Sequence, residues 1–149
     1  EMIAYFKRNN LKPKYRTLLA FPLYEEIGHG GAYVPEEVSE YVALDIGLIG
    51  PDYHADEKTV SICAKDNYSP YDRELTTRII NQAKKTNLNY CVDVFFHYGT
   101  DANAAIRAGN NVYAAAFGMA VINSHGKERC HIDSIVDTTK LAIAYALDL

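Results

Sequence analysis

The chain has few cysteines and no long hydrophobic or basic run, and these absences exclude several classes of protein. Its 3 cysteines are an odd number without a Cys-x-x-Cys pair, so we expect no disulfide framework and a reducing, cytoplasmic location. No apolar run approaches the ~18 residues that a membrane span needs, and no signal-peptide pattern is visible. The net charge is −4 without a long Lys/Arg run, which argues against nucleic acid or an anionic membrane as the partner.

What is present is the composition of an ordinary globular domain. The chain has 149 residues, of which 48% are hydrophobic and 23% charged, and it shows no internal repeat, low-complexity tract or linker. We therefore expect residues 1–149 to form a single domain. Cys63 and Cys91 lie inside apolar, strand-like runs and are interpreted as core residues, whereas Cys130, near two histidines, is left open.

Apolar runs alternate with helical patterns along the chain. Most of the runs are continuous rather than alternating, which is typical of strands buried on both faces. The sequence therefore predicts an α/β fold, a three-layer arrangement of a mostly parallel sheet with helices on both faces. The predicted strands are Tyr15–Leu23, Tyr41–Asp45, Thr59–Ala64, Tyr90–Phe96 and Val112–Phe117.

Helical signals lie between these strands. Ser69 and Pro70 form a cap-like start, and apolar residues at helical spacing continue to about Lys85. The other predicted helices are a segment ending near Met2–Phe6, a short one from Pro35 to Val38, one capped by Thr100 or Asp101 and ended by Gly109, and one capped by Asp133 or Ser134 that buries Ile135, Leu141, Ala144, Tyr145 and Leu147.

Polar residues follow the predicted strands. Glu25 and Glu26 come directly after one strand, Asp45 ends another, and residues 97–101 follow a third. In parallel α/β folds, ligands bind at the carboxyl ends of the strands, so we expect these residues to meet. Two adjacent carboxylates also suit a division of labour, in which one binds a metal ion while the other moves protons.

A metal site can be drawn from these residues. The candidate ligands are Glu26, Asp45 and one histidine, either His125 or His131. Carboxylates together with imidazole suit Zn²⁺, Mn²⁺ or Co²⁺ without distinguishing among them. The remaining histidines are more simply interpreted as loop or helix-cap residues: His29, His54 and His97.

Four short motifs, in order, resemble those of a known family. Glu25-Glu26-Ile27-Gly28 with Gly31-Ala32, Val42-Ala43-Leu44-Asp45, Gly99-Thr100-Asp101-Ala102 and the segment from Ser124 to Arg129 are similar to segments of the cocatalytic metallo-aminopeptidases. This family includes glutamyl aminopeptidase and the tetrahedral aminopeptidases, some members being labelled endoglucanase or cellulase M. The resemblance covers essentially the whole chain.

The resemblance implies a role for each residue. Glu25 would be the general base, passing a proton from the attacking water to the leaving amine of a peptide substrate. Glu26 and His125 would bind one divalent metal ion and Asp45 a second, with zinc expected first and cobalt or manganese as alternatives. Thr100 and Asp101 would line the substrate pocket near the N-terminus of the peptide.

The chain also departs from the family. Phe96-His97-Tyr98 stands where the family has more glycine, which would crowd the pocket. A bridging Asp, a further His and an inserted dimerisation domain, which lie upstream in the family, are not found. We therefore expect the C-terminal part of a catalytic domain that alone binds metal partly or not at all and has little activity. An exposed sheet edge would then favour a homo-oligomer or pairing with a missing N-terminal segment.

Two other functions were weighed. A non-catalytic α/β module that binds a peptide or protein partner would need no complete metal site, although the Glu25-Glu26 pair argues against it. A glycosidase is suggested only by the labels of relatives. The two carboxyl groups of a glycosidase lie ~5–9 Å apart on opposite sides of the sugar. Two residues adjacent in sequence do not readily face each other in this way.

Overall fold

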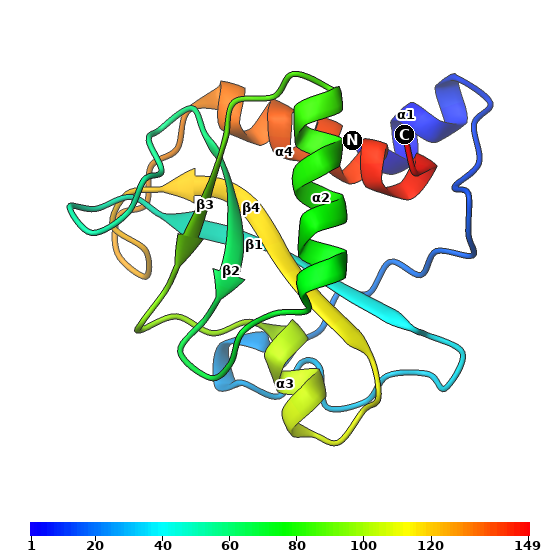
Figure 1. The fold of residues 1–149 in the computed structure, drawn as a ribbon, viewed down its shortest axis with the longest axis horizontal. Helices are drawn as coiled ribbons and strands as arrows, with labels where there is room; N and C mark the ends of the chain where they lie inside the picture. The colour runs from blue at the N-terminus through cyan, green and yellow to red at the C-terminus, as the bar shows by residue number, and fades with distance from the viewer.

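The computed structural model describes residues 1–149 as a mixed sheet covered by helices on both faces (Figure 1). The elements in chain order are α1 (Met2–Arg8), the 3₁₀ turn η1 (Glu25–Ile27), β1 (Glu40–Leu48), β2 (Val60–Lys65), α2 (Arg73–Lys85), β3 (Tyr90–Val94), α3 (Asp101–Arg107), β4 (Tyr113–Val121) and α4 (Ile132–Leu147). None of the helices combines the length and apolarity needed to cross a membrane.

The four strands are ordered β1-β4-β2-β3 across the sheet. β1 pairs with β4 and β2 pairs with β3 in parallel, whereas β2 and β4 run antiparallel. The predicted α/β class with a mostly parallel sheet is confirmed. The antiparallel pair places the carboxyl ends of β1 and β4 opposite those of β2 and β3, so no single edge gathers all the strand ends.

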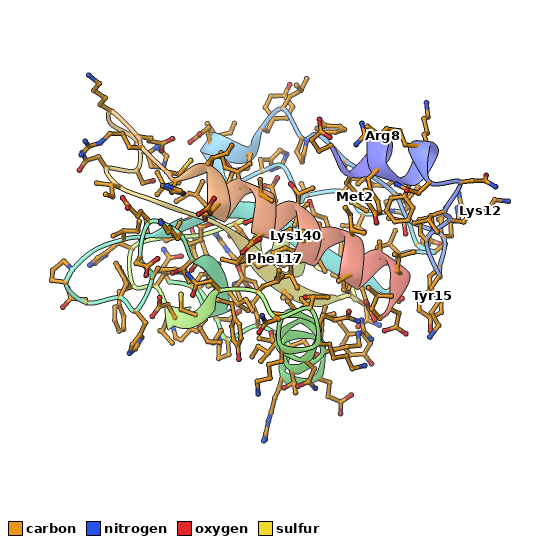
Figure 2. The ribbon with its side chains drawn as sticks, turned by 90° about the horizontal axis from the view of Figure 1, so that it is seen from above. Met2, Arg8, Lys12, Tyr15, Phe117 and Lys140 are labelled. Atoms are coloured by element: carbon orange, nitrogen blue, oxygen red, sulfur yellow. The ribbon has the colours of Figure 1, made fainter.

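Alternate residues of β4 point to opposite faces and separate two cores. Ala115 and Phe117 pack with residues of α2 and α4 on one face. Ala114 and Ala116 pack with Ala102 of α3 on the other. Figure 1 shows α2 and α4 apart from α3, and Figure 2 shows Phe117 beneath α4. α1 lies beside the C-terminal part of α4, near the end of the chain.

The predicted strand Tyr15–Leu23 is wrong in this structure. The segment is extended, but none of its residues makes a backbone–backbone hydrogen bond. Phe21 and Leu23 are 83% and 92% exposed. A strand requires a neighbour to pair with, and β-forming residues alone do not supply one. The segment instead connects α1 to η1 as an open loop (Figure 1).

Three predicted helix starts also need correction. Residues from Pro35 form one turn, in which the Val38 N–H donates to the Pro35 carbonyl at 3.0 Å. α2 begins at Arg73 rather than after Ser69, because the Asp72 carboxylate accepts from the Leu75 N–H and caps the helix. The residues before Asp72 are not helical, because Pro70 forms an isolated β-bridge with Lys65.

The last helix, α4, begins earlier than Asp133 or Ser134. Its N-cap is His131, whose ring Nδ1 accepts from the Asp133 N–H at 3.1 Å. Leu141 and Ala144 are buried as predicted, but Ile135 is 38% exposed. The buried face of α4 is therefore not the predicted apolar stripe, because it also contains Ser134, Thr138 and Ala142.

Candidate active site

Glu25 and Glu26 lie in η1, just after the open loop. The turn ends at Gly28, whose left-handed conformation (φ +68°) reverses the chain. The side chain of Glu26 is 78% exposed, whereas Glu25 is half-buried. Although adjacent in sequence, the two carboxylates meet different surroundings. One is open to solvent and the other lies against the protein.

The glycines after η1 seat this turn on the start of α3. A Cβ on Gly30 would lie 2.2 Å from Asp101 Oδ2, and one on Gly31 would lie 2.1 Å from the Asp101 carbonyl oxygen. Any larger residue would therefore force the turn away from the helix. The close approach brings the Glu25 carboxylate into the neighbourhood of the Asp101 carboxylate.

Asp45 comes from the middle of β1 rather than from its end, because the strand continues to Leu48. Residues two apart on a strand share a face, so Asp45 faces the same side as Ala43, which packs in the α3-side core. Its Oδ1 accepts from the Ile46 N–H at 2.7 Å. A Cβ on the paired Gly118 would lie 1.4 Å from the Asp45 carbonyl oxygen, so the tight pairing of β1 and β4 here requires glycine.

His125 reaches the site from the loop between β4 and α4. Its Nδ1 lies 3.7 Å from Glu26 Oε2. The backbone of His125 has φ +62°, and its N–H donates to Glu128 Oε1 at 3.0 Å. The loop is therefore held in a specific conformation that presents the imidazole to η1.

The other histidines lie elsewhere. His131 uses its ring nitrogen to cap α4, so the geometry favours His125 over His131 as the histidine that meets Glu26. His54 Nδ1 lies 2.7 Å from Asp93 Oδ1, and the His29 ring lies edge-on to Tyr24. His97 is exposed.

The site gathers negative charge without a cationic partner. Burial raises the pKa of Glu25, and the carboxylates of Asp45, Asp101 and Glu26 raise it further, while His125 lowers it. Burial likewise raises the pKa of Asp45 and of Asp101. No lysine or arginine forms an ion pair with any of these acids. A divalent cation placed among them would relieve their mutual repulsion.

The Thr100 side chain already has hydrogen-bond partners, whereas one oxygen of the Asp101 carboxylate has none. The Thr100 hydroxyl is buried, accepts from the Ala102 N–H at 3.1 Å and bonds the Tyr71 hydroxyl at 2.7 Å. Its side chain is thus committed to capping α3. Asp101 is 5% exposed. The backbone N–H groups of Gly30 and Gly31 partly offset the rise that burial causes in its pKa, but its buried Oδ1 has no hydrogen-bond partner. Such an orphaned carboxylate oxygen is costly unless a ligand meets it.

The donor chemistry fits a metal ion, but the side chains are not closely assembled around one. Carboxylates, an imidazole and an orphaned carboxylate oxygen are what a divalent transition metal requires. No group of three or more His, Cys, Asp or Glu side chains is arranged to hold a metal ion. The direct contact between predicted ligands is that of Glu26 with His125.

Two tyrosines near the site were not predicted as site residues. Burial raises the pKa of Asp45, and the nearby Tyr98 hydroxyl partly offsets that rise. Burial raises the pKa of Tyr41, and the nearby Asp101 and Glu25 raise it further. The alternation along β1 could have found Tyr41, because it shares a strand face with Asp45. Tyr98 lies in a loop, where no periodicity indicates the direction of a side chain.

Comparison with known proteins agrees with this fold. The dodecameric PhTET1-12s has a TM-score of 0.74 at 25% identity, over 87% of this chain and 40% of that chain. A TET aminopeptidase from the marine sediment archaeon Thaumarchaeota archaeon SCGC AB-539-E09 shares the fold over 99% of this chain and 44% of its own, with a TM-score of 0.75 at 16% identity. This chain therefore shares the fold of these two proteins.

Sequence similarity assigns the family. YhfE of Bacillus subtilis (strain 168), which bears the provisional name of an aminopeptidase, is 36% identical over 145 residues, covering 97% of this chain and 42% of that protein. The family model for the M42 glutamyl aminopeptidases matches residues 1–141. The chain belongs to the M42 glutamyl aminopeptidase family, which confirms the resemblance seen in the four motifs. It spans about two fifths of the length of these relatives.

Proposed function

We propose that this protein is a metal-dependent aminopeptidase that removes N-terminal residues from peptides. One observation carries the proposal: Glu26 meets His125 at 3.7 Å while further carboxylates gather beside them with no cationic side chain. Membership of the M42 family supports the reaction class. The orphaned Asp101 Oδ1 supports a site that is completed by a ligand.

The residues divide the work as follows. Glu26 and His125 would hold one divalent ion, zinc in the first instance, and Asp45 would hold a second. When bound, such ions polarise the scissile carbonyl and acidify water. Glu25, half-buried and adjacent to Glu26, stays free of the metal ions. It accepts a proton from the attacking water and returns that proton to the leaving amine as the peptide bond breaks.

Asp101 is proposed to recognise the free amine of the peptide. A buried carboxylate oxygen without a partner would bind an N-terminal ammonium group by a charge-assisted hydrogen bond. Thr100 would contribute indirectly, because its hydroxyl caps α3 and fixes the helix turn that carries Asp101. Phe96 and His97, which were expected to crowd the pocket, are exposed instead.

The 149-residue chain alone is proposed to bind metal weakly and to turn over slowly. Its predicted ligands do not form a ready group of three donors, whereas a catalytic zinc ion ordinarily has three protein ligands. The same observation favours one other candidate, a non-catalytic α/β module that binds a peptide or protein partner. Calorimetry that detects no Zn²⁺ or Mn²⁺ binding would support that alternative.

A homo-oligomer is also proposed. The solved relative PhTET1-12s is a dodecamer. In this chain, large apolar side chains are strongly exposed on the open loop, Phe21 and Leu23 among them, and such exposure is typical of an interface. A monodisperse monomer in light scattering would contradict this part of the proposal.

The two adjacent glutamates provide the sharpest test of the mechanism. With Zn²⁺ or Co²⁺ present, we expect slow hydrolysis of an aminoacyl-p-nitroanilide. Glu25→Gln should abolish the hydrolysis without weakening metal binding, because only the proton carrier is lost. Glu26→Gln should weaken both. Equal metal affinity and equal turnover in the two variants would contradict the assigned roles, and Glu36→Gln, an exposed acid elsewhere, serves as the control.

A further inference from the structure

The edge strand β1 has backbone groups without a partner. The strand order β1-β4-β2-β3 leaves one side of β1 without a neighbour. The Ser39 carbonyl and the Ile49 N–H both bond β4, at 2.9 and 3.0 Å. Because backbone groups alternate in direction along a strand, those of Val42 and Leu44 point away from β4. No loop or other strand bonds them, so β1 offers a free edge.

The open loop has unpaired backbone groups as well. Residues 15–23 are extended and make no backbone–backbone hydrogen bond. Thr17 lines two cavities, one of about 240 Å³ that Ser39 and Glu40 also line, and one of about 400 Å³ against α1. The open loop is therefore loosely packed on the rest of the molecule, although its residues are those of a strand.

The two ends of the open loop lie toward the two ends of β1. At its start, Thr17 shares a cavity with Glu40, the first residue of β1. At its end, η1 meets the loop that follows β4, where Glu26 Oε2 lies 3.7 Å from His125 Nδ1, and β4 is parallel to β1. The open loop thus runs in the direction of β1. The connection formed by residues 24–39 is longer than the about a dozen residues that a crossover between parallel strands needs.

We propose that residues 17–23 close onto the free edge of β1 as a further, parallel strand. An extended segment and an unpaired strand edge of matching direction are what strand addition requires. The open form in this structure and the closed form are then two states of one fold. Closure fixes the chain that enters η1 and so restrains Glu25 and Glu26. The pairing itself requires neither a metal ion nor peptidase activity.

Pro22 determines which side of the open loop can pair. Proline has no N–H to donate, so an edge strand accepts it only where its backbone faces away from the neighbouring strand. Because backbone groups alternate, closure directs the N–H groups of Leu19 and Phe21 toward β1 and that of Ala20 toward solvent. The amides of the open loop should therefore differ from one residue to the next.

Two proline variants test the pairing. Phe21→Pro removes an N–H that faces β1 in the closed form, whereas Ala20→Pro removes one that faces solvent, and both residues are exposed. Amide hydrogen exchange followed by NMR measures the effect on β1. In the wild type and in Ala20→Pro, the Val42 and Leu44 amides should exchange at least about tenfold more slowly than in Phe21→Pro. Tenfold corresponds to a loop that is open about a tenth of the time.

Equal exchange of the Val42 and Leu44 amides in all three proteins would overturn the proposal. Slow exchange that is lost on dilution would also overturn it, because pairing with a second copy depends on concentration and pairing within one chain does not. The amides of Ala115 and Phe117 in the central strand β4 are the control for folding and should stay slow in each protein.

The wild type alone provides a second measurement, which does not depend on the folding of a variant. The Leu19 and Phe21 amides should exchange slowly and the Ala20 amide fast, as the position of Pro22 requires. Fast exchange of all three amides would show that the open loop does not pair with β1.

Discussion

Asp93 and Asp45 are both aspartates near the sheet, but their surroundings shift their pKa values in opposite directions. Asp93 accepts from the backbone N–H of His54 at 2.9 Å, from its ring at 2.7 Å and from the Ala55 N–H at 3.1 Å. Burial alone would raise the pKa of Asp93, but these hydrogen bonds outweigh it and hold the pKa below the usual value. Burial raises the pKa of Asp45, and the hydrogen bond from the Ile46 N–H and the nearby Tyr98 hydroxyl do not compensate.

Glu40 and Glu25 repeat the contrast. Glu40 pairs with Arg78 and accepts from the Tyr145 hydroxyl at 2.5 Å, and its pKa is lowered although burial opposes this. Glu25 meets other carboxylates, and its pKa is raised. Acids with built-in partners stabilise the fold, whereas acids gathered without a cation weaken it until a ligand supplies the positive charge.

The largest change in the free energy of unfolding is expected from removing an acid whose hydrogen bonds are all made within the fold. Asp93→Ala leaves the N–H groups of His54 and Ala55 without their acceptor and should lower the free energy of unfolding by about 3 kcal/mol. Urea denaturation measures the loss. His54→Ala is the control, because the His54 ring is 84% exposed and its removal should cost much less. Equal losses in the two variants would show that the ring, not the carboxylate, anchors this loop.

Removing an acid that has no cationic partner should instead raise the free energy of unfolding. Asp45→Asn eliminates one charge from the acidic site while keeping an oxygen acceptor for the Ile46 N–H. The metal-free protein should become more stable by roughly 0.5–1 kcal/mol, visible as a higher melting temperature. Glu36→Gln should change stability little, because this exposed acid forms no ion pair. A destabilised Asp45→Asn variant would break the contrast between the two kinds of acid.

The smallest effect is the pH dependence of the Asp93 contribution. Its pKa is lower in the folded protein than in the unfolded chain, so the unfolded chain binds more protons and stability falls on acidification. The difference in unfolding free energy between wild type and Asp93→Asn should be constant above about pH 5. It should shrink as pH falls through about 4, the unfolded value. A difference that grows on acidification would contradict the assignment.

Four of the five strands predicted from the sequence are present as β1 to β4, whereas the roles predicted for the site residues stay predictions. Glu26 and His125 are about one hundred residues apart in the chain, yet Glu26 Oε2 and His125 Nδ1 lie 3.7 Å apart in the structure. The strand prediction at Tyr15–Leu23 failed, because residue preference describes a single segment whereas a strand depends on its neighbour.

The other misses have local causes. His131 caps α4 with a ring nitrogen, and histidine is not among the residues that ordinarily signal a cap. The antiparallel pairing of β2 with β4 cannot be read from runs of apolar residues, which mark burial and not direction. The Tyr98 hydroxyl, which lies in a loop, influences the pKa of Asp45 in β1, and nothing in the sequence spacing indicates that the two residues are near each other.

The central claim is that the acids around Glu26 lack a cationic side chain because they bind a divalent metal ion. Calorimetric titration with Co²⁺ or Zn²⁺ tests it directly in the wild type, His125→Ala and His131→Asn, where asparagine preserves the helix cap. The account predicts weak but measurable binding that is at least about tenfold weaker in His125→Ala and unchanged in His131→Asn. No binding by the wild type, or binding that depends on His131 and not on His125, would contradict it.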